Sequence, residues 1–156
     1  MKQVPVNYAH KNESGFSLVE VSVAMVIILI ALLGVVSSFT YAITYNAGNN
    51  SRAQALAVLQ QEVEWLRSLK FTPGVTDPGL AGGIRPVKTV TSPNGGTFVV
   101  STFIDNDPAA ANIQTDSDVP NPSIKEIEVR VQLQSPDLGW QSAVPAIIVM
   151  RRVRGN

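Results

Sequence analysis

The 156-residue sequence contains no cysteine and only one histidine, His10. A chain without cysteine makes no disulfide, no thiolate nucleophile and no thiolate metal site. Histidine is the commonest general base and a frequent zinc ligand, and His10 stands alone ahead of the longest apolar segment. These absences remove the most common catalytic groups, and we expect a protein that is not an enzyme.

Charged residues are also scarce. They make up 15% of the sequence, against about 25% in ordinary soluble domains. The 12 Lys and Arg balance the 12 Asp and Glu, so the chain has no overall field, and DNA is not an expected partner. The deficit lies in one segment, because no charged residue occurs between Glu20 and Arg52. Such a composition is typical of a segment that lies in the lipid bilayer.

The apolar run covers residues 16–36, and as a helix it would be about 30 Å long, the thickness of a bilayer core. Lys2 and Lys11 precede it, whereas the first basic residue after it is Arg52. The positive-inside rule therefore predicts a single membrane span with a cytoplasmic N-terminus. A secretory signal peptide usually has an apolar core of about 7 to 15 residues, which is shorter than this run. A plain anchor fits the length, but neither alternative accounts for Glu20.

The predicted helix extends well beyond the apolar run. No proline occurs from Val6 to Thr72, so nothing forces the helix to end with the membrane segment. We expect it to continue to Lys70, because residues 71–74, Phe-Thr-Pro-Gly, are a stop signal. Its second half is amphipathic, with polar side chains opposite an apolar stripe. The stripe comprises Leu56, Leu59, Val63 and Leu66.

After Pro73 the sequence changes to short β-rich segments separated by turns that contain proline and glycine. The predicted strands are residues 86–91, 97–105, 124–134 and 143–153, with turns at 92–96 and 135–139 and loops at 72–85 and 106–123. The third strand is the clearest, because alternate residues from Ile127 to Leu133 are apolar. The predicted fold class is α+β: a long N-terminal helix, its first half transmembrane, with a small antiparallel β-sheet packed on its second half.

Glu20 is the only acid inside the apolar run, and Gly15 and Phe16 stand just before it. A carboxylic acid near the bilayer centre costs about 2.5 to 3.5 kcal/mol, so a partner is expected. If the chain is cut after Gly15, Phe16 acquires a free ammonium one helical turn from Glu20. Staggered parallel helices could then place the Glu20 of one subunit beside the Phe16 ammonium of another, so that the two charges leave water as a pair.

Residues 15–20, Gly-Phe-Ser-Leu-Val-Glu, strongly resemble the N-terminal processing motif of type IV pilins and type II secretion pseudopilins. The resemblance covers roughly residues 1–70 and extends loosely over the rest. It implies that a prepilin peptidase cuts between Gly15 and Phe16 and methylates the new amine of Phe16, and that Glu20 is the assembly residue. It also implies a subunit that waits in the inner membrane, with its head in the periplasm, until an assembly platform draws it into a filament with other subunits of this kind.

Two departures from the family pattern favour a minor subunit over a major pilin. Many major pilins carry a proline in the apolar helix and a C-terminal disulfide loop, and this chain has neither. A minor pilin or minor pseudopilin, in a type IV pilus-like filament or a type II secretion pseudopilus, is therefore predicted. The alternative is a membrane-tethered periplasmic binding module that is not incorporated into a filament. The predicted regions are a cleaved leader (1–15), a transmembrane and filament-core half-helix (16–36), an amphipathic periplasmic half-helix (37–71) and a β-sheet head (72–156).

Four aspartates at or near the longest predicted loop form two Asp-x-Asp pairs: Asp105 with Asp107, and Asp116 with Asp118. Carboxylate oxygens on a flexible loop suit calcium, and some pseudopilins hold calcium in such a loop. The spacing does not match an EF-hand, however, and acids in Asn- and Pro-rich loops are more often solvated turns. No cofactor is therefore expected, and calcium at these four aspartates is the alternative.

Three arginines, Arg151, Arg152 and Arg154, lie close together near the end of the sequence. Such a cluster could contact a phosphate backbone, as in pilins that help DNA uptake. A solvated segment, or one that pairs with acids of a neighbouring subunit, is the preferred interpretation.

Overall fold

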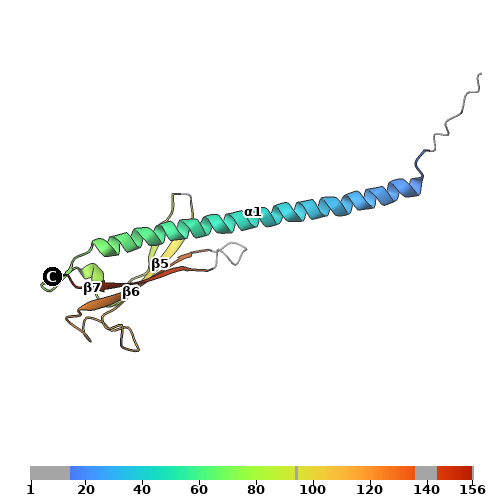
Figure 1. Ribbon diagram of the computed structural model, residues 1–156. Helices are drawn as coiled ribbons and strands as arrows, with labels where there is room; N and C mark the ends of the chain where they lie inside the picture. The colour runs from blue at the N-terminus through green and yellow to red at the C-terminus, as the bar shows by residue number, and fades with distance from the viewer. Residues whose placement is uncertain (1–14, 94, 136–143, 156) are drawn as a thin grey trace, which may run out of the picture. The chain divides into compact units, whose positions relative to one another are not determined.

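The computed structural model describes residues 15–93, 95–135 and 144–155. The chain divides into two compact units, Met1–Tyr41 and Ala42–Asn156. Helix α1, Leu18–Ser68, contributes its first part to one unit and its second part to the other (Figure 1). The α+β class predicted from the sequence is confirmed, because one long N-terminal helix is followed by antiparallel sheets.

The second unit contains a five-stranded antiparallel sheet in the order β3-β5-β6-β7, with β4 also paired to β5. Its strands are β3 (Gly83–Ile84), β4 (Lys88–Thr91), β5 (Thr97–Asp105), β6 (Ile124–Leu133) and β7 (Ala146–Val153). A separate two-stranded sheet pairs β1 (Phe71–Thr72) with β2 (Val75–Thr76), and a short 3-10 helix, η1, covers Pro78–Leu80. The three long strands β5, β6 and β7 form consecutive antiparallel pairs.

The long strands lie close to their predicted positions, and the errors concern short elements. Strand β5 has the predicted bounds, and β6 ends one residue earlier than expected. The segment 72–85, expected to be a loop, contains two of the two-residue strands, η1 and the end of a third strand. Two-residue strands are stabilised by backbone pairing across the fold, so no alternation of apolar residues marks them in the sequence. Positions 136–143, which include most of the predicted 135–139 turn, lie outside the described residues.

The predicted hairpin between β4 and β5 is confirmed by its register, which pairs Thr91 with Thr97. Ser92 donates its N–H to the carbonyl of Gly96 at 2.7 Å, and Gly95 donates to the carbonyl of Ser92 at 2.9 Å. Gly95 has a φ of 90°, in the left-handed region that side chains disfavour, so glycine suits this position. Asn94, which belongs to the same predicted turn, lies outside the described residues.

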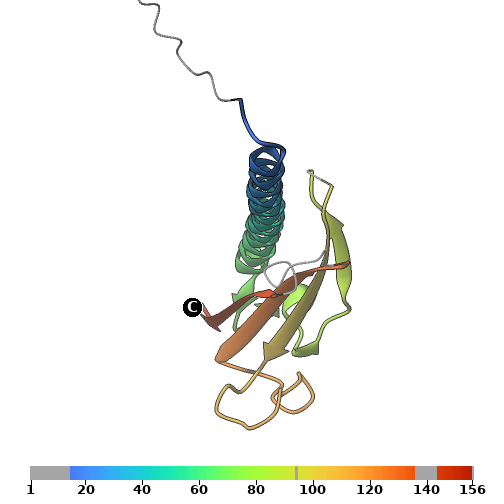
Figure 2. The ribbon, with the colours of Figure 1, turned by 90° about the vertical axis from the view of Figure 1, so that its right-hand side faces the viewer.

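The core of the second unit lies between α1 and one face of the sheet, and Figure 2 shows the second half of the helix over that face. Alternate residues of β5 and β6 point inward, and the register places Val100 opposite Val131 and Ile104 opposite Ile127. Each large apolar side chain buried here contributes about 1.5 to 3 kcal/mol. The core comprises Ala55, Val58, Leu59, Val63, Leu66, Phe71, Leu80, Phe98, Val100, Ile104, Ile127, Val129, Val131 and Ala146.

The buried stripe of α1 differs in part from the predicted one. Leu59, Val63 and Leu66 are buried as expected, whereas Leu56 is 43% exposed. Glu62 is buried instead, and its carboxylate accepts a hydrogen bond from the ammonium of Lys88 on β4. The buried residues follow the 3.6-residue period from Ala55, and this period brings Glu62, rather than Leu56, to the face that the sheet covers.

Arg152 on β7 closes the end of α1. Its Nη1 donates to the carbonyl of Leu66 at 2.6 Å, and its Nη2 donates to the carbonyl of Leu69 at 2.9 Å. The last carbonyls of a helix have no partner within the helix, and a guanidinium supplies two donors at once. Burial lowers the pKa of Arg152 from its ordinary value. The contact ties the last strand of the sheet to the helix.

Candidate functional site

Ser17 defines the start of α1. Its carbonyl oxygen accepts the N–H of Val21 at 3.2 Å, and its Oγ accepts the N–H of Glu20 at 3.2 Å. This is the N-cap arrangement, in which a serine just before the first turn satisfies N–H groups that have no partner within the helix. Glu20 consequently lies in the first turn of α1, where the helix dipole favours a negative charge.

Gly15 and Phe16 precede this cap and lie outside any helix or strand. Phe16 is 82% exposed within the chain. Among the described residues, no atom lies within 4 Å of a Cβ placed on Gly15. Packing among the described residues therefore does not require glycine at position 15. Both residues are exposed, so no described part of the chain covers the bond between them.

Among the described residues, the carboxylate of Glu20 has no ion-pair partner. The residues around it are apolar, and no other charged side chain follows until Arg52. Gly15, Phe16 and Glu20, which the sequence singled out, thus lie together around the first turn of one helix. The structure contains one chain, so the predicted pairing of Glu20 with another subunit stays a prediction.

The first part of α1 exposes its apolar side chains on all sides. In the described part of the chain, α1 is the one helix that is long and apolar enough to cross a membrane. Lipid or other apolar helices are the environments that such a surface fits. The exposed side chains include Leu18, Val19, Val21, Val23, Met25, Val26, Ile27, Ile28, Leu29, Ile30, Leu32, Leu33, Val35, Val36, Phe39 and Ile43.

The hydroxyl groups in this apolar part are satisfied by the helix itself. Ser22, Ser37 and Ser38 each donate to the carbonyl four residues earlier, at 2.9 Å. Thr40 does the same to Val36 at 3.0 Å. A hydroxyl that is bonded in this way enters an apolar environment without an unpaired donor. Serine and threonine in this segment are therefore compatible with a membrane position.

The four aspartates of the candidate calcium site accept hydrogen bonds from the loop. Asp105 accepts the N–H groups of Asp107 and Gln114 at 3.0 and 2.9 Å. Asp118 accepts the N–H and hydroxyl of Thr115, which lower the pKa of its carboxyl. Among the described residues, no three acidic or histidine side chains come close enough together to hold a metal ion. Calcium at these aspartates stays a prediction, and the loop forms no ready-made cage for it.

Asp116 belongs to a buried network that sequence reasoning missed. The ammonium of Lys125 is 1% exposed, donates to Asn106 Oδ1, and lies 3.3 Å from Asp116 Oδ1. Asn106 Nδ2 donates to the same aspartate oxygen at 2.8 Å and to the carbonyl of Val119 at 3.1 Å. Partial burial raises the pKa of Asp116, but the hydrogen bonds from Asn106 and Gly82 and the charge of Lys125 outweigh it and leave this pKa below its ordinary value. The network holds the long loop against β6.

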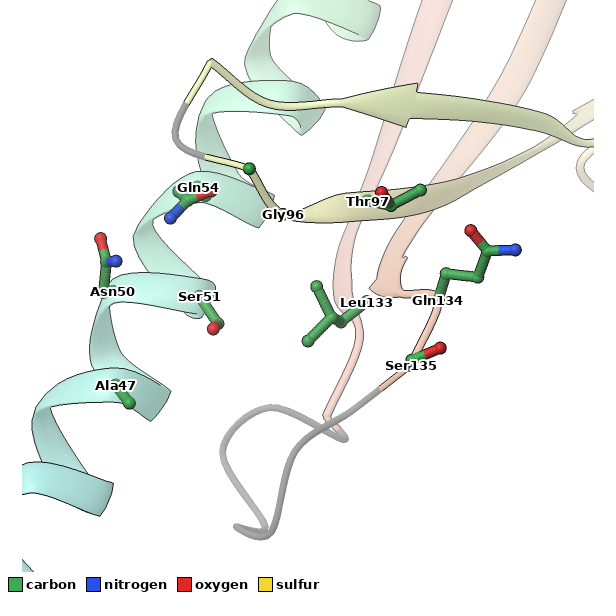
Figure 3. Close-up of a pocket in the computed structure, with 10 residues that line it drawn as sticks. Ala47, Asn50, Ser51, Gln54, Gly96, Thr97, Leu133, Gln134 and Ser135 are labelled. Carbon is green, nitrogen blue, oxygen red and sulfur yellow. The ribbon is translucent and has the colours of Figure 1, made fainter.

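A hollow of about 480 Å³ lies between α1 and the ends of β5 and β6 (Figure 3). Every described lining residue is uncharged, and the Oε1 atom of Gln54 is buried there without a hydrogen-bond partner among the described residues. A smaller groove of about 240 Å³ contains the Glu62–Lys88 pair. Trp65 lies beside it, with Lys88 Nζ 5.2 Å from its ring centroid. The pair and the ring stabilise each other, so this groove is part of the packing of α1 on β4.

Two of the three clustered arginines already have partners within the chain. Arg151 donates to Glu126 at 2.7 Å, and Arg152 bonds the end of α1. We expected these arginines to be solvated or to pair with acids of a neighbouring subunit. Arg151 instead pairs with an acid of the adjacent strand in its own chain. These contacts leave little of the cluster for phosphate.

The first turn and most of the apolar part of α1 lie within a segment that matches a known sequence motif. A family model described as the prokaryotic N-terminal methylation motif matches residues 10–36. Neither the curated proteins nor the solved structures gave a match. The matched segment contains Gly15, Phe16 and Glu20, together with the cap at Ser17.

Proposed function

We propose that this chain is a type IV pilin-like or pseudopilin-like precursor, on the strength of the matched methylation motif, and that it acts as a minor pilin or minor pseudopilin subunit. A prepilin peptidase cuts it between Gly15 and Phe16 and methylates the new amine of Phe16. The subunit then leaves the inner membrane for a type IV pilus-like filament or a type II secretion pseudopilus, with Glu20 as the assembly residue. The motif indicates a structural subunit rather than an enzyme.

One observation carries this proposal: the methylation motif covers an exposed peptide bond followed at once by a capped apolar helix. Gly15 supports it further, since packing among the described residues does not require glycine there. A requirement for a residue without a side chain at this position comes from whatever binds the bond from outside. A peptidase that must approach the backbone closely supplies that requirement.

Assembly depends on two features of the first part of α1: its exposed apolar surface and Glu20. Its exposed apolar surface passes from lipid to a bundle of similar helices, a transfer that gains little from hydrophobicity because lipid is equally apolar. Close packing and the pairing of Glu20 with the ammonium of another subunit's Phe16 therefore supply the specificity. A charge pair in an apolar bundle is formed at one stagger of the helices, so it sets their register.

The processing step is tested by the intact mass of the protein isolated from membranes. The expected mass lacks residues 1–15 and carries one additional methyl group. An intact leader in cells that contain an active prepilin peptidase would refute the proposal.

Glu20 separates the filament subunit from the alternative of a tethered periplasmic binding module. Glu20→Gln is expected to insert into the membrane normally but to lose incorporation into sheared filaments, because the neutral side chain no longer pairs with an ammonium. Glu64→Gln is the matched control, since Glu64 is an exposed acid of the same helix outside the apolar run. If Glu20→Gln is incorporated as well as the control, the tethered module becomes the better description.

A further inference from the structure

The helix start at Ser17 decides the conformation of the residues before it. Two bonds to Ser17, from the N–H groups of Glu20 and Val21, make it the N-cap residue. An N-cap residue has non-helical backbone angles, so the residues before it are free of the helical hydrogen-bond pattern. Gly15 and Phe16 accordingly have no regular secondary structure, and the bond between them lies one residue from the cap.

The sequence offers a second helix start. Ser14 stands three residues before Ser17, and serine is a favoured N-cap. A helix that began after Ser14 would contain Gly15 and Phe16 in its first turn. A peptidase binds the backbone on both sides of the bond that it cuts, and backbone groups that are committed to a helix are less available for this. A helix capped by Ser17 therefore leaves the Gly15–Phe16 bond outside the helix, whereas a helix capped by Ser14 would include this bond.

We propose that Ser17 is a positioning residue for leader removal: by capping α1, it keeps the Gly15–Phe16 bond outside the helix and open to the peptidase. The inference rests on the proposed function, since it concerns the same cleavage. Ser17 does not take part in the bond-breaking step. Its hydroxyl acts only through the place at which the helix begins.

The test compares rates of leader removal for four full-length chains in membranes that contain a prepilin peptidase. These are the wild type, Ser17→Ala, Ser17→Thr and Ser22→Ala, each normalised to the amount of inserted precursor. Alanine caps poorly, and Ser17→Ala is expected to be processed more slowly, by up to about fivefold, the change in the equilibrium between helix starts that corresponds to an N-cap of about 1 kcal/mol. Threonine retains a capping hydroxyl and is expected to restore most of the rate.

Ser22→Ala is the matched control, because it removes a hydroxyl of the same helix that bonds the carbonyl of Leu18 and caps nothing. It is expected to be processed at the wild-type rate. If Ser17→Ala is processed as fast as the wild type, the positioning role is overturned while the proposed function stands. If Ser17→Thr is as slow as Ser17→Ala, the peptidase contacts the serine itself and the capping explanation is overturned. An intact leader in the wild type would overturn the proposed function as well.

Discussion

Lys125 shows how one side chain can hold a long loop in place. Its ammonium is buried, and it contacts Asn106, at the start of the loop between β5 and β6, and Asp116, further along the same loop. Asn106 is itself buried and bonds both Asp116 and Val119. Removal of any member leaves a polar group without its partner, which is costly in a buried position. The loop is therefore ordered by polar contacts rather than by an apolar core of its own.

The lowered pKa of Asp116 predicts an acid-sensitive contribution to stability. A carboxyl with a lower pKa in the folded state than its ordinary value of 3.8 stabilises the protein above about pH 4. This contribution is lost as the pH falls below 4 and through the folded-state pKa. Asp116→Asn is expected to lose less unfolding free energy than the wild type between pH 5 and pH 3. The difference should be about 1 kcal/mol or less, because the aspartate is half-exposed.

Urea unfolding at several pH values, followed by tryptophan fluorescence, measures this difference. Asp107→Asn is the control, since Asp107 bonds the backbone of Ala109 and takes no part in the Lys125 network. Equal pH slopes for the wild type and Asp116→Asn would contradict the prediction.

At the residue scale, Glu20 and Ser17 carry signals of different kinds in the sequence. Glu20 was identifiable because an acid in an apolar run is costly. Ser17 was not identified, because it carries no charge and only caps the backbone N–H groups of the first turn. Its signal was the spacing Ser-x-x-Glu, which is typical of a helix start. Lys125 was not predicted as part of a site, although the sequence places it on the same inward-facing side of β6 as Ile127. Its partners, by contrast, come from a loop whose path the sequence does not determine.

At the scale of elements, α1 combines two environments in one helix. The first part exposes apolar side chains all round, whereas the second part buries one stripe against the sheet. Strand β6 was predictable because apolar residues alternate from Ile127 to Leu133, and β5 because it is rich in β-branched and aromatic residues. The place of Glu62 in the helix stripe was missed, because a charged residue does not count toward an apolar stripe and its partner, Lys88, comes from a distant strand.

The packing of α1 on the sheet is tested with two leucines of the same helix. Leu66 is fully buried, and Leu66→Ala is expected to cost about 3 kcal/mol of unfolding free energy through lost burial and the cavity left behind. Leu56 is 43% exposed, and Leu56→Ala is expected to cost less than about 1 kcal/mol. Urea unfolding of the detergent-solubilised protein measures both values. Equal losses would mean that the helix presents a different face to the sheet.

At the scale of the whole molecule, the division between Tyr41 and Ala42 separates a unit with a buried core from a unit whose described side chains are all exposed. The second unit contains the entire buried core, including the part of α1 that packs on the sheet. The first unit has no buried residue among those described. The predicted region boundaries at residues 15, 36 and 71 stay predictions, since they concern processing and the membrane rather than packing.

This division predicts that residues 42–156 fold without the rest of the chain. The fragment is expected to be soluble without detergent and to unfold cooperatively in urea, because it retains every buried apolar residue of the core. Circular dichroism and size-exclusion chromatography measure these properties. A second fragment that begins at residue 60 is the control, since it lacks Ala55, Val58 and Leu59 and should lose cooperative unfolding. Failure of the longer fragment to fold would show that the apolar part of α1 contributes to the stability of the head.

The bond between Arg152 and the end of α1 has a consequence for the order of events in the cell. A ribosome makes α1 first and β7 after all the other described strands, so the donors for Leu66 and Leu69 arrive late. Until β7 is made, the edge of β6 that pairs with it stays unpaired, and the carbonyls of Leu66 and Leu69 lack the donors of Arg152. The head therefore completes its fold only once β7 has been made, and until then the nascent polypeptide has to be shielded from association through the unpaired edge of β6.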